Sequence, residues 1–184
     1  MEYRVLGKSG LRVSRLGLGG IPIQKSNEDG AKCLIAALMR EGVNFIDTAR
    51  GYTVSEELLG AALDGVREHF VLATKSMART KEAMAADIEI SLQNLQTDYI
   101  DLYQIHNPND AQLDTVLAPG GAMEALIEAK AQGKIGHIGL TAHSLSVLER
   151  ALSLDGSPSV LQKLRHGCCK QSPGAPDGCG NHEY

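Results

Sequence analysis

The chain has 184 residues, which is enough for one domain with a sizeable core. Its formal net charge of −4 gives no electrostatic case for binding nucleic acid or an anionic membrane. The N-terminus lacks the apolar segment of a signal peptide, and no apolar run approaches the roughly 20 residues that cross a bilayer. We therefore expect a cytoplasmic globular protein whose partners include neither nucleic acid nor membrane.

The first residues predict a β-hairpin followed by a short strand. Tyr3–Val5 and Leu11–Val13 flank a turn rich in glycine, and Leu16–Gly20 is the next apolar run. The segment Leu18–Pro22 is also glycine-rich, but it lacks the Gly-x-Gly-x-x-Gly spacing of a dinucleotide-binding sheet.

From this point, short apolar runs alternate with segments of helical periodicity. The predicted strands are Leu16–Gly20, Val43–Asp47, Phe70–Lys75, Tyr99–His106 and Ile135–Thr141. The predicted helices are Asp29–Glu41, one capped by Ser55, one capped by Thr80, Gly121–Gln132 and one capped by Ser144. Such alternation implies right-handed crossovers and a parallel α/β sheet. An open doubly wound sheet and part of a (β/α)₈ barrel both satisfy it.

The pattern changes near Ser153. A barrel needs eight strands and typically about 250 residues, and this chain supplies five predicted strands and then no more. Residues 153–184 contain one weak apolar cluster and are rich in Gly, Pro, Ser and Cys. We therefore predict a partial barrel over residues 1–152 and an atypical, disordered tail over residues 153–184.

The cysteines predict no metal site. Cys33 lies in a predicted helix, where an inert core thiol is expected. The tail contains Cys168, Cys169, Cys179 and His182, but adjacent cysteines rarely both bind one zinc ion, and the Cys-x₂-Cys pair typical of zinc sites is missing.

Four residues with complementary chemistry stand at or just beyond predicted strand ends: Asp47, Tyr52, Lys75 and His106. Each alone has an ordinary structural explanation, as a cap, a packed aromatic, a solvated strand end or a turn residue. In a parallel sheet, however, the carboxyl ends of the strands meet at one rim, where active sites of such folds lie. Their joint placement therefore favours a shared site.

Together these side chains can donate a proton to a carbonyl that receives a hydride. A free phenol has a pKa of about 10, and a nearby ammonium lowers it; we expect Lys75 to act on Tyr52 in this way. Asp47 is expected to pair with Lys75 and hold it in place. His106 is expected to donate a hydrogen bond to the carbonyl oxygen.

Several long motifs resemble those of the aldo-keto reductases. They are the run Leu6–Gly19, the segment Asn44–Ala49 followed by Tyr52 and Ser55–Glu57, and the runs Leu72–Lys75, Asp98–His106 and Gly133–Gly139. The resemblance runs from about Tyr3 to Leu152. It implies a (β/α)₈ barrel, truncated here after about five βα units, and an NADP(H)-linked reduction of a small-molecule carbonyl, with Asp47, Tyr52, Lys75 and His106 as the catalytic tetrad.

The resemblance also bears on cofactor binding, for which Gly20 and Thr141 are the predicted residues. The family often holds the nicotinamide amide through Ser-Asn after the fifth strand, and here Thr141-Ala142 keeps the hydroxyl and loses the amide. Nothing after Leu152 resembles the sixth to eighth strands, which grip the cofactor phosphates in the family.

Two explanations of this break stay open. The tail can be the product of a shifted reading frame or of a truncated gene. Alternatively, the missing half is supplied by another chain or by self-association through exposed barrel edges. The chain is thus either a carbonyl reductase or its catalytically inactive remnant.

Overall fold

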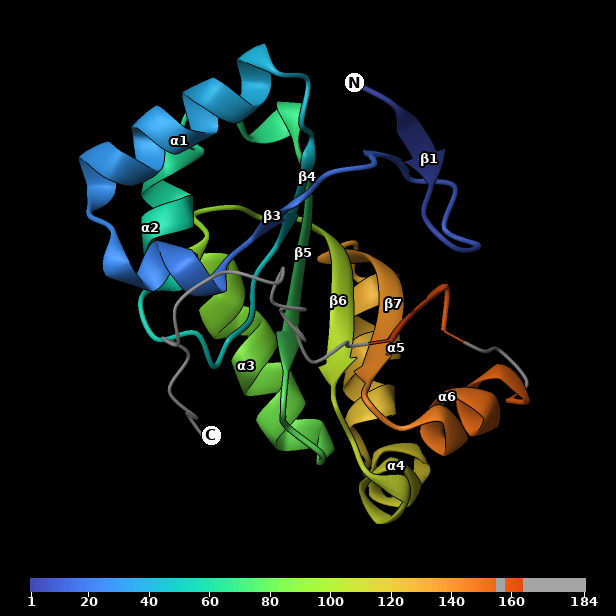
Figure 1. Ribbon diagram of the computed structural model, residues 1–184. Helices are drawn as coiled ribbons and strands as arrows, with labels where there is room; N and C mark the ends of the chain where they lie inside the picture. Colours follow the sequence, from blue (N-terminus) through green and yellow to red (C-terminus); the bar gives the residue numbers. More distant parts are fainter. Residues whose placement is uncertain (155–157, 164–184) are drawn as a thin grey trace, which may run out of the picture.

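A six-stranded parallel sheet forms the centre of the molecule. Figure 1 shows a computed structural model of the chain, which describes residues 1–154 and 158–163. The strands, hydrogen-bonded to one another in chain order, are β3 (Leu18–Gly19), β4 (Phe45–Asp47), β5 (Val71–Ser76), β6 (Ile100–His106), β7 (Ile135–Ala142) and β8 (Val160–Lys163). Because no strand is inserted out of order, the sheet has the topology of a barrel wall and not of a doubly wound sheet.

Helices connect these strands and pack on one face of the sheet (Figure 1). They are α1 (Glu28–Arg40), α2 (Ser55–Ala62), α3 (Lys81–Asn94), α4 (Asp110–Leu117), α5 (Ala122–Ala131) and α6 (Leu145–Leu152), with 3₁₀ turns η1 (Ile21–Lys25) and η2 (Arg67–His69). Thr80 caps α3 as predicted, since its hydroxyl accepts a hydrogen bond from the N–H of Ala83.

The expected cap of α2 is wrong. The N-cap residue is Val54, and Ser55 is the first helical residue. The hydroxyl of Ser55 is buried and donates instead to the carbonyl of Gly20, 2.9 Å away. This serine therefore ties α2 to the end of β3 and does not cap its own helix.

The N-terminal hairpin lies beside the amino ends of the strands (Figure 1). Its strands β1 (Tyr3–Val5) and β2 (Arg12–Ser14) pair antiparallel, as the sequence predicts. The N–H of Ser14 donates to Oδ1 of Asn44 just before β4, and the N–H of Lys8 donates to the carbonyl of Ser159 just before β8. The hairpin thus bridges the second and the last strand of the sheet.

Side chains alternate between the two faces of the sheet with the period of two that strands impose. Ile46, Leu72 and Tyr103 belong to the large core shared with the helices. Their neighbours Phe45, Ala73 and Leu102 belong to a small cluster on the opposite, inner face, together with Val160 of β8. Polar residues two positions further along the same strands therefore also face inward, at the carboxyl ends.

The predicted five βα units are confirmed, but the prediction that no strand follows them is wrong. β8 pairs in parallel with β7, with Leu161 opposite Leu140 and Gln162 opposite Thr141. The sequence reading also missed α4, in which only Leu113 and Val116 are buried. This helix is only eight residues long, too short for a helical periodicity to stand out in the sequence.

The expectation that Cys33 is buried in the core is wrong. Cys33 is exposed and not a core thiol, and Leu34, Ile127 and Leu152 are exposed as well. The tail was predicted to be disordered over residues 153–184, of which Val160–Lys163 forms β8. Residues 155–157 and 164–184, with the cysteines of the tail, lie outside the described residues. Within the described part, no helix is long and apolar enough to cross a membrane, and no three metal-binding side chains form a group.

Candidate active site

The carboxyl ends of β4 and β5 bring Asp47 and Lys75 into contact. Nζ of Lys75 donates to Oδ2 of Asp47 at 2.8 Å and to the carbonyl of Thr48 at 2.9 Å. The Lys75 side chain is only 1 % exposed and that of Asp47 is 19 % exposed. A buried ammonium needs such partners because its charge is costly to remove from water.

Tyr52 and His106 lie close to this pair and contact each other. The Lys75 ammonium is 5.0 Å from the centroid of the Tyr52 ring. The rings of Tyr52 and His106 meet edge to face, with centroids 6.1 Å apart. All four predicted site residues are therefore gathered at one end of the sheet, although they come from segments up to 59 residues apart in the sequence.

His106 is surrounded by burial and positive charge. Burial, together with the positive charges of Lys75, Arg79 and His143, lowers the pKa of His106 to about 4. Its Nδ1 is buried and has no hydrogen-bond partner in the described residues. His106 is therefore a neutral imidazole near neutral pH, with one N–H available as a donor.

Gln104 is a buried member of this site that sequence reasoning missed. Its Nε2 donates to Oδ1 of Asp47 at 3.1 Å, so the carboxylate is held by Lys75 on one oxygen and Gln104 on the other. Gly139 on β7 leaves the necessary room, since a Cβ there would lie 2.9 Å from Cγ of Gln104. The signal was available: Gln104 precedes His106 by two residues and so shares its face of the strand.

The predicted cofactor residues Gly20 and Thr141 both have structural roles. A Cβ on Gly20 would lie 2.6 Å from Oγ1 of Thr48 and 2.8 Å from Oγ of Ser55, so only glycine fits there. Thr141 is fully buried, and its hydroxyl accepts a hydrogen bond from the N–H of Asn107 at 3.2 Å. Asn107 follows His106 directly and has a positive φ of 46°.

A buried polar network on the helix side supports the loop that carries Tyr52. Glu56 of α2 is 1 % exposed and accepts hydrogen bonds from Thr74 of β5 and Ser91 of α3, each at 2.8 Å. Nη1 of Arg50 lies 3.2 Å from its other oxygen. Thr74 is the neighbour of Lys75 on β5, so this network fixes the Tyr52 loop against the strand that carries Lys75.

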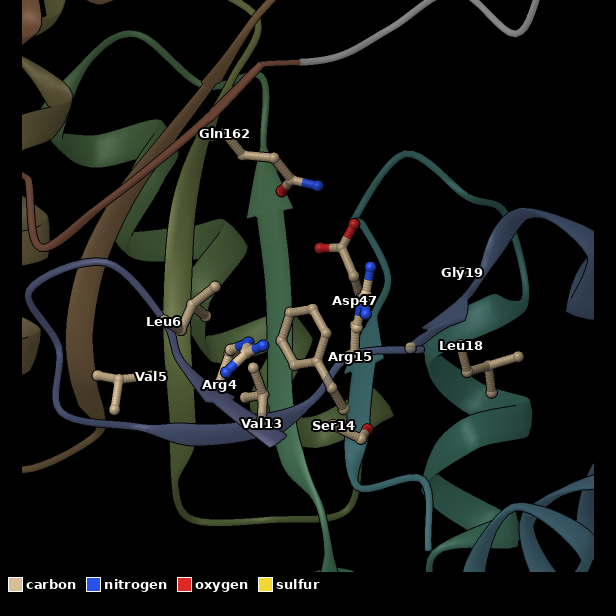
Figure 2. A pocket seen from close by; sticks show the side chains of 12 residues that line it. Arg4, Val5, Leu6, Val13, Ser14, Arg15, Leu18, Gly19, Asp47 and Gln162 are labelled. Carbon is tan, nitrogen blue, oxygen red and sulfur yellow. The ribbon is translucent and has the colours of Figure 1, made fainter. Parts of the chain in front are cut away.

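An open cavity of about 420 Å³ runs along the inner face from the hairpin to Asp47. Figure 2 shows Gln162 of β8 extending into the same space as Asp47 of β4. Gly19 also lines it, with no atom within 4 Å of where a Cβ would stand. Gln162 was missed because its strand was not predicted.

Residues 15–172 match the model of the aldo/keto reductase family. The chain belongs to this family of oxidoreductases, whose barrel wall and rim of polar strand ends it shares. The match extends past Leu152, so the prediction that nothing beyond this residue resembles the family is wrong.

Individual relatives agree with the family assignment. The chain is 33% identical to L-galactose dehydrogenase of Arabidopsis thaliana over 168 residues, which is 83% of this chain and 52% of that protein. A putative aldo-keto reductase from Pseudomonas aeruginosa superposes with a TM-score of 0.74 at 34% identity, covering 82% of this chain and 63% of that one.

The holo form of the aldo-keto reductase AKR11C1 from Bacillus halodurans superposes with a TM-score of 0.73 at 31% identity, covering 87% of this chain and 55% of that one. The chain thus spans about half the length of the curated relatives it matches.

Proposed function

We propose that this chain carries the proton-donating half of an NAD(P)H-dependent reductase that converts aldehydes or ketones to alcohols. The observation that carries the proposal is the buried Lys75 ammonium, bonded to Asp47 and lying 5.0 Å from the Tyr52 ring centroid. A cation held in this position stabilises the phenolate that remains after Tyr52 gives up a proton. Asp47 fixes the cation, and Gln104 fixes Asp47.

His106 has a separate role in the proposed reaction. A neutral imidazole donates one hydrogen bond, and a donor aimed at the carbonyl oxygen stabilises the negative charge that develops there. The proton of Tyr52 then passes to that oxygen, and the C=O double bond becomes a C–OH single bond. Tyr52 regains its proton from solvent before the next turnover.

The residues present fit the nicotinamide end of the cofactor. When bound, NAD(P)H supplies the hydride that forms the new C–H bond. The Gln162 amide faces the cavity beside Asp47, and Oε1 of Gln104 is buried with no hydrogen-bond partner in the described chain. Thr141 and Gly20 are the other proposed contacts. NADP(H) is the proposed form, and titration of NADPH against NADH, followed by nucleotide fluorescence, measures the choice.

The test is the pair Tyr52→Phe and Tyr3→Phe. The hydroxyl of Tyr52 has no recorded hydrogen bond among the described residues, so its removal is expected to leave stability nearly unchanged while lowering carbonyl reduction about 10²–10⁴-fold. Tyr3 lies in the hairpin, and its hydroxyl donates to the carbonyl of Gly42. Tyr3→Phe is therefore expected to retain activity. Reduction that survives in Tyr52→Phe contradicts the proposal.

A catalytically inactive half-barrel is the second candidate. Within the described residues, β3 and β8 each pair with one neighbouring strand only, and an unpaired strand edge invites pairing with another chain. Light scattering coupled to size exclusion distinguishes the candidates. A self-associated species without NADPH binding favours the inactive half-barrel. A cytoplasmic location and the division into residues 1–152 and 153–184 accompany both candidates as proposals.

A further inference from the structure

Arg79 is a half-buried cation whose side chain binds only backbone carbonyls among the described residues. Four arginines are half-buried in the described part of the chain, and three of them, Arg50, Arg67 and Arg150, pair with carboxylates. No described carboxylate pairs with Arg79. Burial lowers the pKa of Arg79, whereas hydrogen bonds to Asp110 and Asp114 raise that of Arg150. A partly desolvated charge of this kind favours an anionic partner.

The guanidinium of Arg79 is anchored at the rim of the candidate site. Nη2 donates to the carbonyl of His106 at 2.8 Å, and Nη1 donates to the carbonyl of Ala78 at 3.3 Å. The Arg79 backbone is fixed as well, because its carbonyl accepts a hydrogen bond from the N–H of Ala122 at the start of α5. The remaining N–H of each Nη atom has no recorded partner in the described chain, so the fork is held in place with donors to spare.

The charge of the site favours an anion. The carboxylate of Asp47 is already paired with Lys75. Arg79 is a second cation of the site, so the formal charges of Asp47, Lys75 and Arg79 add up to +1. The charge of Arg79 also reaches His106, where it contributes to the lowered pKa. A ligand bound beside His106 therefore experiences a positive potential from a fixed guanidinium.

We infer that Arg79 binds an anionic group, a carboxylate or a phosphate, carried by the carbonyl substrate. The inference rests on the proposed function and gives it a substrate class. His106 holds the carbonyl oxygen, and the neighbouring guanidinium holds the charged end of the same molecule. Arg79 acts in recognition and takes no part in proton transfer.

The kinetic test uses matched pairs of substrates with NADPH. Succinic semialdehyde is compared with butanal, and glyceraldehyde 3-phosphate with glyceraldehyde. The preference for the anionic member, measured as the ratio of kcat/KM within a pair, is expected to be at least about 10-fold, as for a charge-assisted hydrogen bond. The pair with the larger ratio identifies carboxylate or phosphate. Arg79→Met is expected to bring the ratio near unity through KM, and Arg79→Lys to retain part of it.

A binding test works without turnover. The imidazole resonances of His106 are followed by NMR while succinate, which cannot be reduced, is added. An anion on Arg79 partly cancels the charge felt by His106, so the resonances shift and the pKa of His106 rises; Arg79→Met abolishes the response. Arg40→Met, on the exposed side of α1, is the control and is expected to behave like the unchanged chain in both tests.

The outcomes separate the two proposals. Carbonyl reduction that depends on Tyr52, without anionic preference and without a response to succinate, overturns the role of Arg79 and leaves the proposed function standing. A succinate response that depends on Arg79, with no reduction of any carbonyl, supports the anion site and overturns the proposed function. Absence of both activity and response overturns both. If the circular dichroism spectrum shows that Arg79→Met does not fold, Arg79→Lys takes its place. A ratio of kcat/KM that is unchanged in Arg79→Lys contradicts recognition of the anion by the guanidinium.

Discussion

Nζ of Lys75 lies 2.8 Å from Oδ2 of Asp47, in a pocket where the lysine is 1 % exposed. An ammonium so completely removed from water depends on its partner, because an unpaired buried charge costs far more than the pair contributes. The ion pair between Lys75 and Asp47 therefore affects the stability of the fold as well as the chemistry of the site.

A double-mutant cycle measures this dependence. Asp47→Leu alone leaves the Lys75 charge unpaired and is expected to lower the free energy of unfolding by about 3 kcal/mol. Adding Lys75→Met removes the orphaned charge and is expected to restore part of the loss. Urea denaturation of the four chains gives the coupling energy, for which we expect at least about 1 kcal/mol. Additive effects of the two substitutions contradict a buried pair.

The stability of the chain is expected to fall as the pH is lowered, in part because of His106. The pKa of His106 is about 4 in the folded chain and 6.5 for an ordinary histidine. Between these values the unfolded chain binds the proton and the folded chain does not, so acid favours unfolding. As the pH falls from 6.5 towards 4, the free energy of unfolding of the unchanged chain should therefore decrease more than that of His106→Gln. An NMR titration midpoint for His106 near 6.5 contradicts this expectation.

Two adjacent glycines offer a matched pair of substitutions. A Cβ at position 20 meets Oγ1 of Thr48 at 2.6 Å and Oγ of Ser55 at 2.8 Å, whereas at position 19 it meets nothing within 4 Å. Gly20→Ala is therefore expected to lower the free energy of unfolding by about 1–3 kcal/mol. Gly19→Ala is expected to change it by less than about 0.5 kcal/mol. Thermal denaturation compares the two, and equal losses rule out the close approach at Gly20.

The buried network around Glu56 makes a similar comparison possible. Glu56 accepts from Thr74, Ser91 and Arg50, while Glu57 beside it is exposed. In Glu56→Gln the Arg50 guanidinium loses a charged acceptor, and we expect a loss of about 1–3 kcal/mol. Glu57→Gln changes the same net charge and should be nearly neutral. Chemical denaturation of both variants tests whether burial decides the difference.

The sequence predicted the inner-face residues at the carboxyl ends of three strands. Asp47, Lys75 and His106 each close an apolar run, and strand ends in a parallel sheet converge, so their meeting followed from the pattern alone. Tyr52 lies on the loop that follows Asp47, and its position and complementary chemistry, and then its resemblance to a family motif, pointed to its place.

The remaining features depend on contacts that a local pattern does not contain. β8 is four residues long and is defined by its pairing with β7, which no periodicity records. Ser55 has the residue type of a helix cap, yet its hydroxyl is taken by the carbonyl of Gly20, 35 residues earlier. Arg79 could be recognised only from the structure, in which the other half-buried arginines pair with carboxylates.

The alternation of side chains between the two faces makes the site sensitive to one kind of mutation and tolerant of another. Phe45 and Asp47, or Leu102 and Gln104, share a face because they are two residues apart. Removal of one residue within a strand would turn its polar end towards the helices and dismantle the site. Lengthening a loop at the amino ends of the strands does not change which side chains of a strand face inward. Natural insertions and engineered tags are therefore best accommodated there.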